Sequence, residues 1–231
     1  MTRSQYIEAV KVKLEEVSPF DEPASFIAAD DGEKNAIKPI VSYIDSTLDE
    51  ATKNCLLALP LSLLHPDIEA VPKLKGGSED DLTVVVDNKG VGRCKPVQNF
   101  RFVRFHHDVL LRDITAFITS EDELYLLQQN PYTRGGIAKP VAVWNAALDE
   151  MEIYSFPPTL RGETLTDAVL LGVRTNKKPN SDAVAEEVVQ SPISDYIVLE
   201  CAALVADILG DANTAQMMRT QQQQKLLAVL S

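Results

Sequence analysis

The chain has 231 residues, 45% of them hydrophobic and 24% charged, and its 34 acidic and 22 basic residues give a net charge of −12. This length and composition fit a globular protein with one large domain or two small ones. The acidic balance disfavours a nucleic-acid-binding protein, because affinity for phosphates needs clustered Lys and Arg. An acidic surface would let DNA slide past without adhering, although the same charge also serves simply to keep a cytosolic protein in solution.

The sequence predicts neither a membrane segment nor an export signal. No window approaches the roughly 20 continuous apolar residues of a membrane span, and the longest apolar stretch, Cys55–Leu64, is interrupted by Pro60. The first five residues lack the apolar core of a signal peptide. Three widely spaced cysteines predict buried thiols rather than a metal site or a catalytic group. We therefore expect a protein that is made in a cytosol.

The start of the chain has the pattern of two helices. Thr2–Gln5 has the spacing of a capping box, and apolar residues then recur every three or four positions, so a helix is expected over residues 3–17. The same periodicity predicts a second helix over residues 34–57, with Pro39 near its first turn, where a proline is tolerated. Beyond it, Lys75–Asp81 predicts a flexible, charged loop.

The middle of the chain has the period of two that is typical of strands. Leu82–Val86 is rich in β-branched residues, and the turn Asp87–Gly90 separates it from a second expected strand. Further strands are predicted in four places: after Phe100, over residues 140–144, over residues 151–156 and over residues 165–173.

The end of the chain is predicted to be helical again. Ser191-Pro192 opens a helix with a broad apolar face, and Gly210 stops it. Asp211 then caps a last helix over residues 212–229. The resulting order predicts the α+β class, a helical body with a β-rich central insert. We expect three parts, 1–75, 76–180 and 181–231, with the two helical ends forming one compact domain.

The common signatures of enzymes are missing from the sequence. It has no G-x-S-x-G elbow and no phosphate-binding G-x-x-x-x-G-K-[ST] loop. Gly90–Lys95 begins like a dinucleotide-binding loop, but it lies in a predicted hairpin and lacks the last glycine. We expect a protein without catalytic residues, cofactor or metal. An enzyme whose active site is assembled from distant residues remains the alternative.

Two segments are candidates for a protein interface. Gln128–Gly136 is a polar stretch that contains Tyr132 and Arg134, residue types that interfaces favour, and Lys139 follows closely. The C-terminal helix carries four glutamines and then an apolar end with Leu226, Leu227 and Leu230, which has the pattern of a docking tail. A plain loop before a strand, and packing of the last helix on the protein's own body, are the corresponding alternatives.

The second half of the chain carries a series of short motifs in a fixed order: Val103–Phe105, Leu110–Asp113, Gln128–Gly136, Lys139–Ala142, Glu152–Pro157, Ile193–Tyr196, Leu199–Ala203 and Asp211–Ala215. This order resembles that of head-to-tail connector (adaptor) subunits of tailed phages, and Asn130–Ala142 is similar to ring proteins of crAss-like phages. The resemblance covers about half of the chain, and the first 75 residues share only their helical character.

The resemblance implies a virion protein that is assembled in the host cytoplasm. In such adaptors a ring, commonly of twelve copies, joins the portal protein to further tail or ring proteins and leaves a channel for DNA. The implied partners are therefore copies of the chain itself, the portal and neighbouring tail proteins, with DNA passing through without sequence-specific binding and with no membrane. A cytosolic protein-binding adaptor is the second alternative, and it predicts a monomer or dimer.

Overall fold

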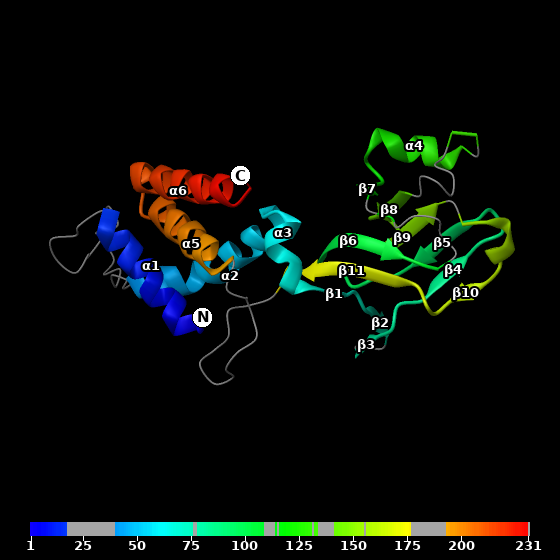
Figure 1. Cartoon of the computed structure of the whole chain (residues 1–231), viewed down its shortest axis with the longest axis horizontal. Coiled ribbons are helices and arrows are strands. Elements are labelled where there is room, and N and C mark those ends of the chain that lie inside the picture. Colours follow the sequence, from blue (N-terminus) through cyan, green and yellow to red (C-terminus); the bar gives the residue numbers. More distant parts are fainter. Residues whose placement is uncertain are drawn as a thin grey trace, which may run out of the picture. The chain divides into compact units, whose positions relative to one another are not determined.

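The structure is a computed structural model, and it describes residues 1–17, 40–75, 78–108, 114, 116–130, 132–133, 141–154, 156–176 and 193–230. Two compact units make up the chain. We call Met1–Asp67 together with Thr175–Ser231 the helical unit, and Ile68–Arg174 the strand unit. Figure 1 shows that both ends of the chain belong to the helical unit. The α+β class, with helices at both ends and a strand-rich middle, is confirmed.

The helical unit is built around one buried helix. It contains α1 (Arg3–Val17), α2 (Ile40–Ala58), the short α3 (Leu61–Leu64), a 3₁₀ turn (His65–Asp67), α5 (Ser194–Ile208) and α6 (Ala212–Leu230). α5 packs against α1, α2 and α6. Ten of its fifteen residues are buried, as expected of a helix that is apolar nearly all round.

Local sequence signals fix the ends of these helices. The predicted capping box forms, since the Thr2 amide donates to Gln5 Oε1 (2.8 Å) and the Gln5 amide donates to Thr2 Oγ1 (3.3 Å). Gly210 adopts a positive φ of 78° after α5, which favours glycine. Asp211 then accepts hydrogen bonds from the Thr214 amide and hydroxyl. These bonds, the hydroxyl's first, lower the pKa of Asp211.

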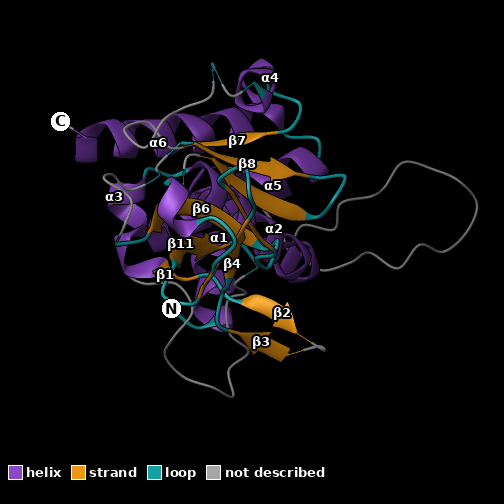
Figure 2. Cartoon of the chain, turned by 90° about the vertical axis from the view of Figure 1, so that its right-hand side faces the viewer, coloured by secondary structure: helices purple, strands orange, loops and turns teal. Residues whose placement is uncertain are grey.

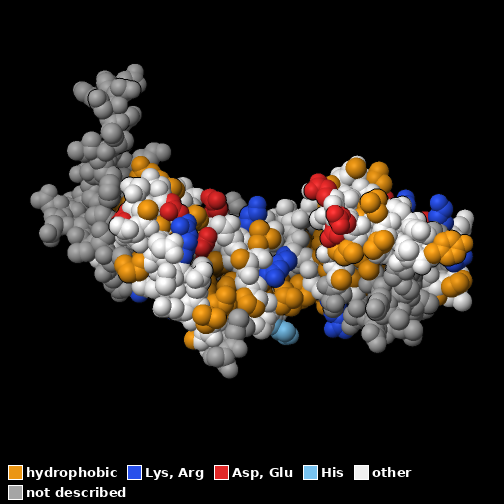
Figure 3. Space-filling view, turned by 90° about the horizontal axis from the view of Figure 1, so that it is seen from above, with side chains coloured by type: hydrophobic (Ala, Val, Ile, Leu, Met, Phe, Trp, Pro, Cys, Tyr) orange, Lys and Arg blue, Asp and Glu red, His pale blue; other side chains and the backbone are white. Residues whose placement is uncertain are grey.

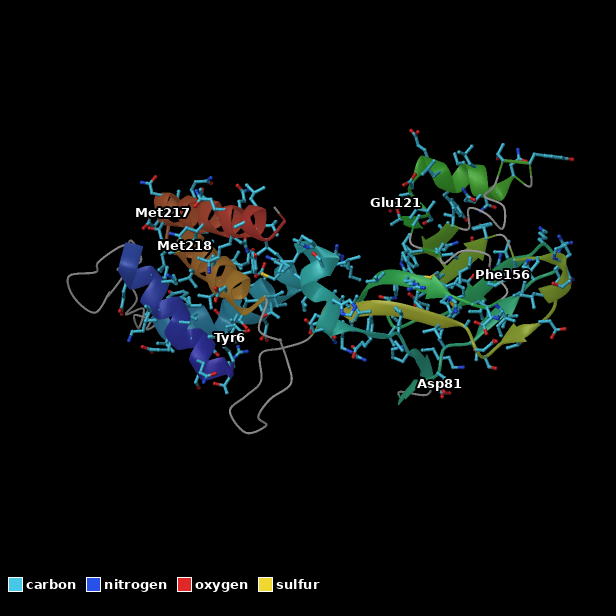
Figure 4. The ribbon with its side chains drawn as sticks, in the orientation of Figure 1. Tyr6, Asp81, Glu121, Phe156, Met217 and Met218 are labelled. Carbon is cyan, nitrogen blue, oxygen red and sulfur yellow. The ribbon has the colours of Figure 1, made fainter. Side chains whose placement is uncertain are left out.

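Polar contacts also join the helices of this unit. The Tyr6 hydroxyl donates to Ser194 Oγ (3.1 Å) and so links α1 to the start of α5. Arg3 pairs with Asp45 (2.6 Å) and Asp49 (2.8 Å) on α2. Tyr6 itself is fully buried (Figure 4). The first helix is therefore held by both apolar burial and defined polar bonds.

The strand unit contains three sheets. Six strands pair in the order β10-β4-β5-β9-β8-β7, three in the order β1-β11-β6, and β2 pairs with β3. Every pairing is antiparallel except that of β7 with β8. The elements are β1 (Ile68–Ala70), β2 (Lys73–Lys75), β3 (Ser78–Asp80), β4 (Val84–Val86), β5 (Val91–Cys94), β6 (Phe100–His106), β7 (Phe117–Thr119), α4 (Glu123–Gln129), β8 (Val141–Asn145), β9 (Glu150–Tyr154), a 3₁₀ turn (Pro158–Leu160), β10 (Thr164–Leu165) and β11 (Val169–Arg174).

The six-stranded sheet has two different faces. Along β9, Met151 and Ile153 point into the main apolar core, which also holds Phe105 and Phe156; Phe156 is labelled in Figure 4. Because side chains alternate along a strand, Glu152 and Tyr154 lie on the opposite face. That face holds a smaller cluster, in which Tyr125 of α4 packs against Val91, Val143 and Tyr154.

Three expectations need correction. The expected loop Lys75–Asp81 is largely a hairpin, since β2 and β3 pair with each other; Gly76 and Gly77 lie outside the described residues. The single strand expected over residues 165–173 is two strands, β10 and β11, which belong to different sheets. The stretch that begins at Gln128 does not start as a loop, because Gln128 and Gln129 end helix α4.

Candidate protein interface

Helix α4 follows the edge strand β7 directly. Its N-cap is Asp122, whose side chain accepts a hydrogen bond from the Leu124 amide (2.8 Å), the usual way of satisfying the first free amides of a helix. β7 runs parallel to β8, with Thr119 opposite Trp144, so α4 begins at the edge of the six-stranded sheet. Figures 1 and 2 both place α4 beyond β7 and β8.

Helix α4 packs Tyr125 on the sheet and buries one polar side chain, while its leucines are exposed. Gln128 is buried and donates to the Leu124 carbonyl oxygen (3.3 Å). The three leucines of the helix are exposed instead: Leu124 by 51%, Leu126 by 71% and Leu127 by 46%. A surface helix normally turns its apolar residues inward. In α4, Tyr125 and Gln128 face the rest of the chain, and the three leucines are left uncovered.

A buried polar network fixes this orientation. The Gln129 amide donates to the Tyr154 hydroxyl (3.1 Å), which donates in turn to Glu152 Oε2 (2.6 Å). Glu152 is only 3% exposed, and its other oxygen lies 3.5 Å from the Arg93 guanidinium. Burial first, and then the hydrogen bond to Glu152, raise the pKa of Tyr154. Tyr154 therefore keeps its proton and stays a donor to Glu152.

The turn after α4 presents an aromatic side chain. Asn130 Oδ1 accepts a hydrogen bond from the Tyr132 amide (3.0 Å), and the Thr133 hydroxyl donates to the Leu127 carbonyl oxygen (2.8 Å). These bonds hold the turn against the end of the helix, and the Tyr132 side chain is 96% exposed. We call Leu126, Leu127 and Tyr132 the α4 face; Leu124, two residues before Leu126, points to another side of the helix.

Acidic residues border the α4 face. Glu121, Asp122 and Glu123 precede or begin the helix, and Figure 4 labels Glu121 at this end. Seen from above, apolar side chains gather beside acidic ones on this part of the strand unit (Figure 3). Glu123 lies one turn before Leu126 and Leu127, so the three side chains share one side of the helix.

Of the interface residues predicted in this region, the structure describes one. Tyr132 lies on the exposed turn, while Arg134 and Lys139 lie outside the described residues. The leucines of α4 were not predicted as interface residues. The sequence contained a usable signal for the helix, since Asp122 followed by Glu123 and three leucines is the pattern of an N-cap before a helical first turn.

The end of α6 contributes a second uncovered apolar region. Leu226 is half-buried, whereas Leu227 is 68% exposed; the side chain of Leu230 lies outside the described residues. Ion pairs hold α6 to α5, between Arg219 and Asp207 and between Lys225 and Asp195. The last turn of α6 therefore packs one leucine inward and presents the next one to solvent.

Between α2, α5 and α6 lies a small apolar hollow of about 130 Å³. Its lining consists of Asn54, Cys55, Ala58, Leu59, Glu200, Gln222, Gln223 and Leu226. The Gln222 amide donates to the Tyr196 carbonyl oxygen (3.2 Å) and so fixes one wall. The single acidic residue of the lining, Glu200, accepts a hydrogen bond from the Asn54 amide (3.0 Å). We call this site the helical hollow.

Comparisons of the chain with protein-family models and with curated proteins find no match. Within the described residues, no three His, Cys, Asp or Glu side chains are grouped so that they could hold a metal ion. Among the described helices, none has both the length and the apolar character needed to cross a membrane. The uncovered apolar faces of α4 and α6 are therefore the features on which a function can be argued.

Proposed function

We propose that this chain is a virion structural protein that forms a ring in the head-to-tail connector of a tailed phage, between portal and tail. The exposed leucines of α4 carry the binding part of this proposal, because they face solvent in the single chain. Covering one leucine side chain contributes about 1.5–3 kcal/mol. Leu126, Leu127 and Tyr132 could form the apolar centre of a contact with another protein.

The distribution of uncovered surface supports a ring rather than a simple pair. In a ring each subunit meets its two neighbours through two different surfaces, whereas a twofold dimer uses one surface twice. Among the described residues, exposed apolar side chains occur in both units, including the α4 face in the strand unit and the last turn of α6 in the helical unit. The motif order described above supplies the connector assignment, with the portal and further tail or ring proteins as partners.

The charge of the chain is compatible with a wall of a DNA channel. A net charge of −12 repels phosphates, so DNA would pass without sequence-specific binding. Assembly in the host cytoplasm and a final place in the virion follow from the same proposal.

The first test is the mass of the purified protein by light scattering, alone and mixed with a portal protein from the same source. We expect a closed oligomer of many copies, commonly twelve, either without the portal or in its presence. A monomer or dimer that ignores the portal would overturn the proposal and favour a protein-binding adaptor.

A further inference from the structure

We propose that a groove in the strand unit binds an arginine-bearing segment of a partner protein. The groove has a volume of about 410 Å³, within the range of about 300–1,000 Å³ that is typical of ligand sites. Three stretches of chain line it: residues 70–72 at the end of β1, residues 80–82 at the end of β3, and residues 166–170 at the start of β11. Since the groove shares no residue with the α4 face, this inference goes beyond the ring and does not depend on it.

The groove combines an apolar base with acidic groups at the surface. Its buried apolar lining consists of Val71, Leu82, Ala168 and Leu170. Three exposed aspartates line it as well, namely Asp80, Asp81 and Asp167; Asp81 is labelled in Figure 4. Such a lining complements a side chain that has an apolar stem and a positive end, which is the character of Arg and Lys.

Negative charge exceeds positive charge at the groove. No basic side chain is among its lining residues, but two described basic residues adjoin it. The first is His107, whose Nε2 lies 3.3 Å from Asp167 Oδ1. The second is Lys73, which lies opposite Asp80 in the hairpin and donates to Thr83 Oγ1 (3.1 Å). Even when both are charged, three carboxylates face two cations, so the groove attracts a cationic partner and repels an anionic one.

The carboxylate of Asp167 is held in place from inside the fold. The side chain of His107 is only 3% exposed, whereas that of Asp167 is 66% exposed, so a buried imidazole anchors a carboxylate that still reaches solvent. The His107 ring also packs edge-on against the Phe156 ring, with the ring centroids 6.3 Å apart. A carboxylate that is already held loses less side-chain freedom when a ligand binds.

The arrangement of the carboxylates favours an extended cation over a metal ion. Within the described residues, no three acidic, His or Cys side chains are grouped so that they could hold a metal, so the three aspartates do not converge on one point. A guanidinium has five N–H donors in a planar fork and can bond carboxylates in more than one direction. We therefore assign arginine as the side chain that enters the groove.

An edge strand gives the groove a means of binding main chain as well. β1 lies at the edge of the three-stranded sheet, and the Val71 amide donates to the Leu170 carbonyl oxygen (2.8 Å). Because backbone groups along an antiparallel strand alternate in direction, the neighbouring Ala70 turns its amide and carbonyl away from β11. Ala70 is exposed and lines the groove. An extended segment can add to such an edge, which favours a peptide over a small polyamine.

Fluorescence anisotropy tests the site in the full chain, whether the chain forms a ring or not. The probe is the peptide acetyl-Thr-Val-Arg-Val-Thr-amide labelled with an uncharged dye, and the same peptide with Glu in place of Arg should not bind. Asp81→Lys reverses a charge of the lining at an exposed position and should weaken binding by about tenfold or more. Glu50→Lys is the matched control, since it makes the same change of charge at an exposed position on α2, in the helical unit.

Each outcome supports or overturns the site. Binding that is lost in Asp81→Lys and kept in Glu50→Lys supports it. Absence of binding by the wild-type chain, an equal loss in both variants, or equal binding of the Glu peptide would overturn it. Spermidine that displaces the peptide at an equal concentration would replace the partner protein by a small cation. Circular dichroism checks folding, and if Asp81→Lys does not fold, Asp81→Asn removes the charge and should still weaken binding. Light scattering reports on the ring separately, so either proposal can fail alone.

Discussion

In the helical unit, α5 turns apolar side chains toward three neighbouring helices, and its buried Ser194 accepts a hydrogen bond from Tyr6. In the strand unit, α4 packs Tyr125 on the sheet, buries Gln128, bonds Gln129 to Tyr154 and leaves its leucines in solvent. The two helices differ in what lies beneath them. Beneath α4 is a strand face that carries Glu152 and Tyr154 and therefore needs polar partners.

This difference separates residues that hold the fold from residues that are free to bind. A buried polar group is tolerated when all its hydrogen bonds are made, and no unsatisfied buried side-chain atom is found within the described residues. The leucines of α4 are 46–71% exposed and belong to neither apolar cluster of the strand unit.

The largest loss of stability is expected from substitutions that create cavities in the apolar cores. They test whether both units are stabilised by buried apolar side chains. Ile153→Ala in the strand unit and Ile197→Ala in the helical unit each remove a fully buried side chain, and each should lower the free energy of unfolding by about 2–5 kcal/mol. Urea unfolding measures this, with the fluorescence of the single tryptophan, Trp144, reporting on the strand unit and far-UV circular dichroism reporting mainly on the helices. A loss below about 1 kcal/mol at either position would contradict the burial described above.

A smaller loss of stability is expected when the polar network of the strand unit is disrupted at Glu152. Glu152→Ala leaves the Tyr154 hydroxyl without its acceptor and should destabilise the strand unit by about 1–3 kcal/mol. Hydrogen exchange should also rise in the amides of α4. Glu152→Gln keeps an acceptor of similar shape and should restore most of the protection, whereas equal exchange in the two variants would show that the network does not hold α4.

The smallest effect per group is expected from the buried thiols, two in the helical unit and one in the strand unit. Burial raises the pKa of Cys201 to about 11 and that of Cys94 to about 12, and it raises that of Cys55 as well. A raised pKa in the folded state favours the neutral thiol. The stability it contributes is fully present below the ordinary value of 9.0 and is lost as pH rises above it.

Between pH 8 and 9.5 each thiol should therefore lose about 1 kcal/mol of stability, measured as the urea midpoint at each pH. This pH range lies below the ordinary pKa of a tyrosine side chain. The variant Cys55→Ala/Cys201→Ala should keep only the part of this slope that is due to Cys94. An unchanged slope would assign the pH dependence to other groups.

Strong local signals made the helical ends predictable. The capping box at Thr2 and the stop at Gly210 fixed α1 and the α5–α6 turn to within a residue or two, because these signals act through hydrogen bonds to neighbours in sequence. The split between β10 and β11 was not predictable from periodicity, since it depends on pairing with β4 in one sheet and with β6 in another. Such pairings join residues far apart in the chain.

The orientation of α4 is a further example. Its apolar residues Leu124, Tyr125, Leu126 and Leu127 are consecutive and cannot all face inward, and in the structure Tyr125 packs on the sheet while the leucines are exposed. A helix pattern states which side chains share a face, but the surface beneath decides which face is covered. Tyr132 could be predicted as an interface residue from its residue type. The exposure of Leu126 could not be predicted, because it depends on how α4 packs on the sheet.

The insertion of the strand unit between Asp67 and Thr175 has a consequence for synthesis on the ribosome. Domains tend to fold as they emerge, at about 5–20 residues per second. α1 and α2 emerge first, but α5, against which both pack, is made only after the whole strand unit. The lining of the helical hollow comes from α2, α5 and α6, so the hollow is incomplete until α6 has been synthesised.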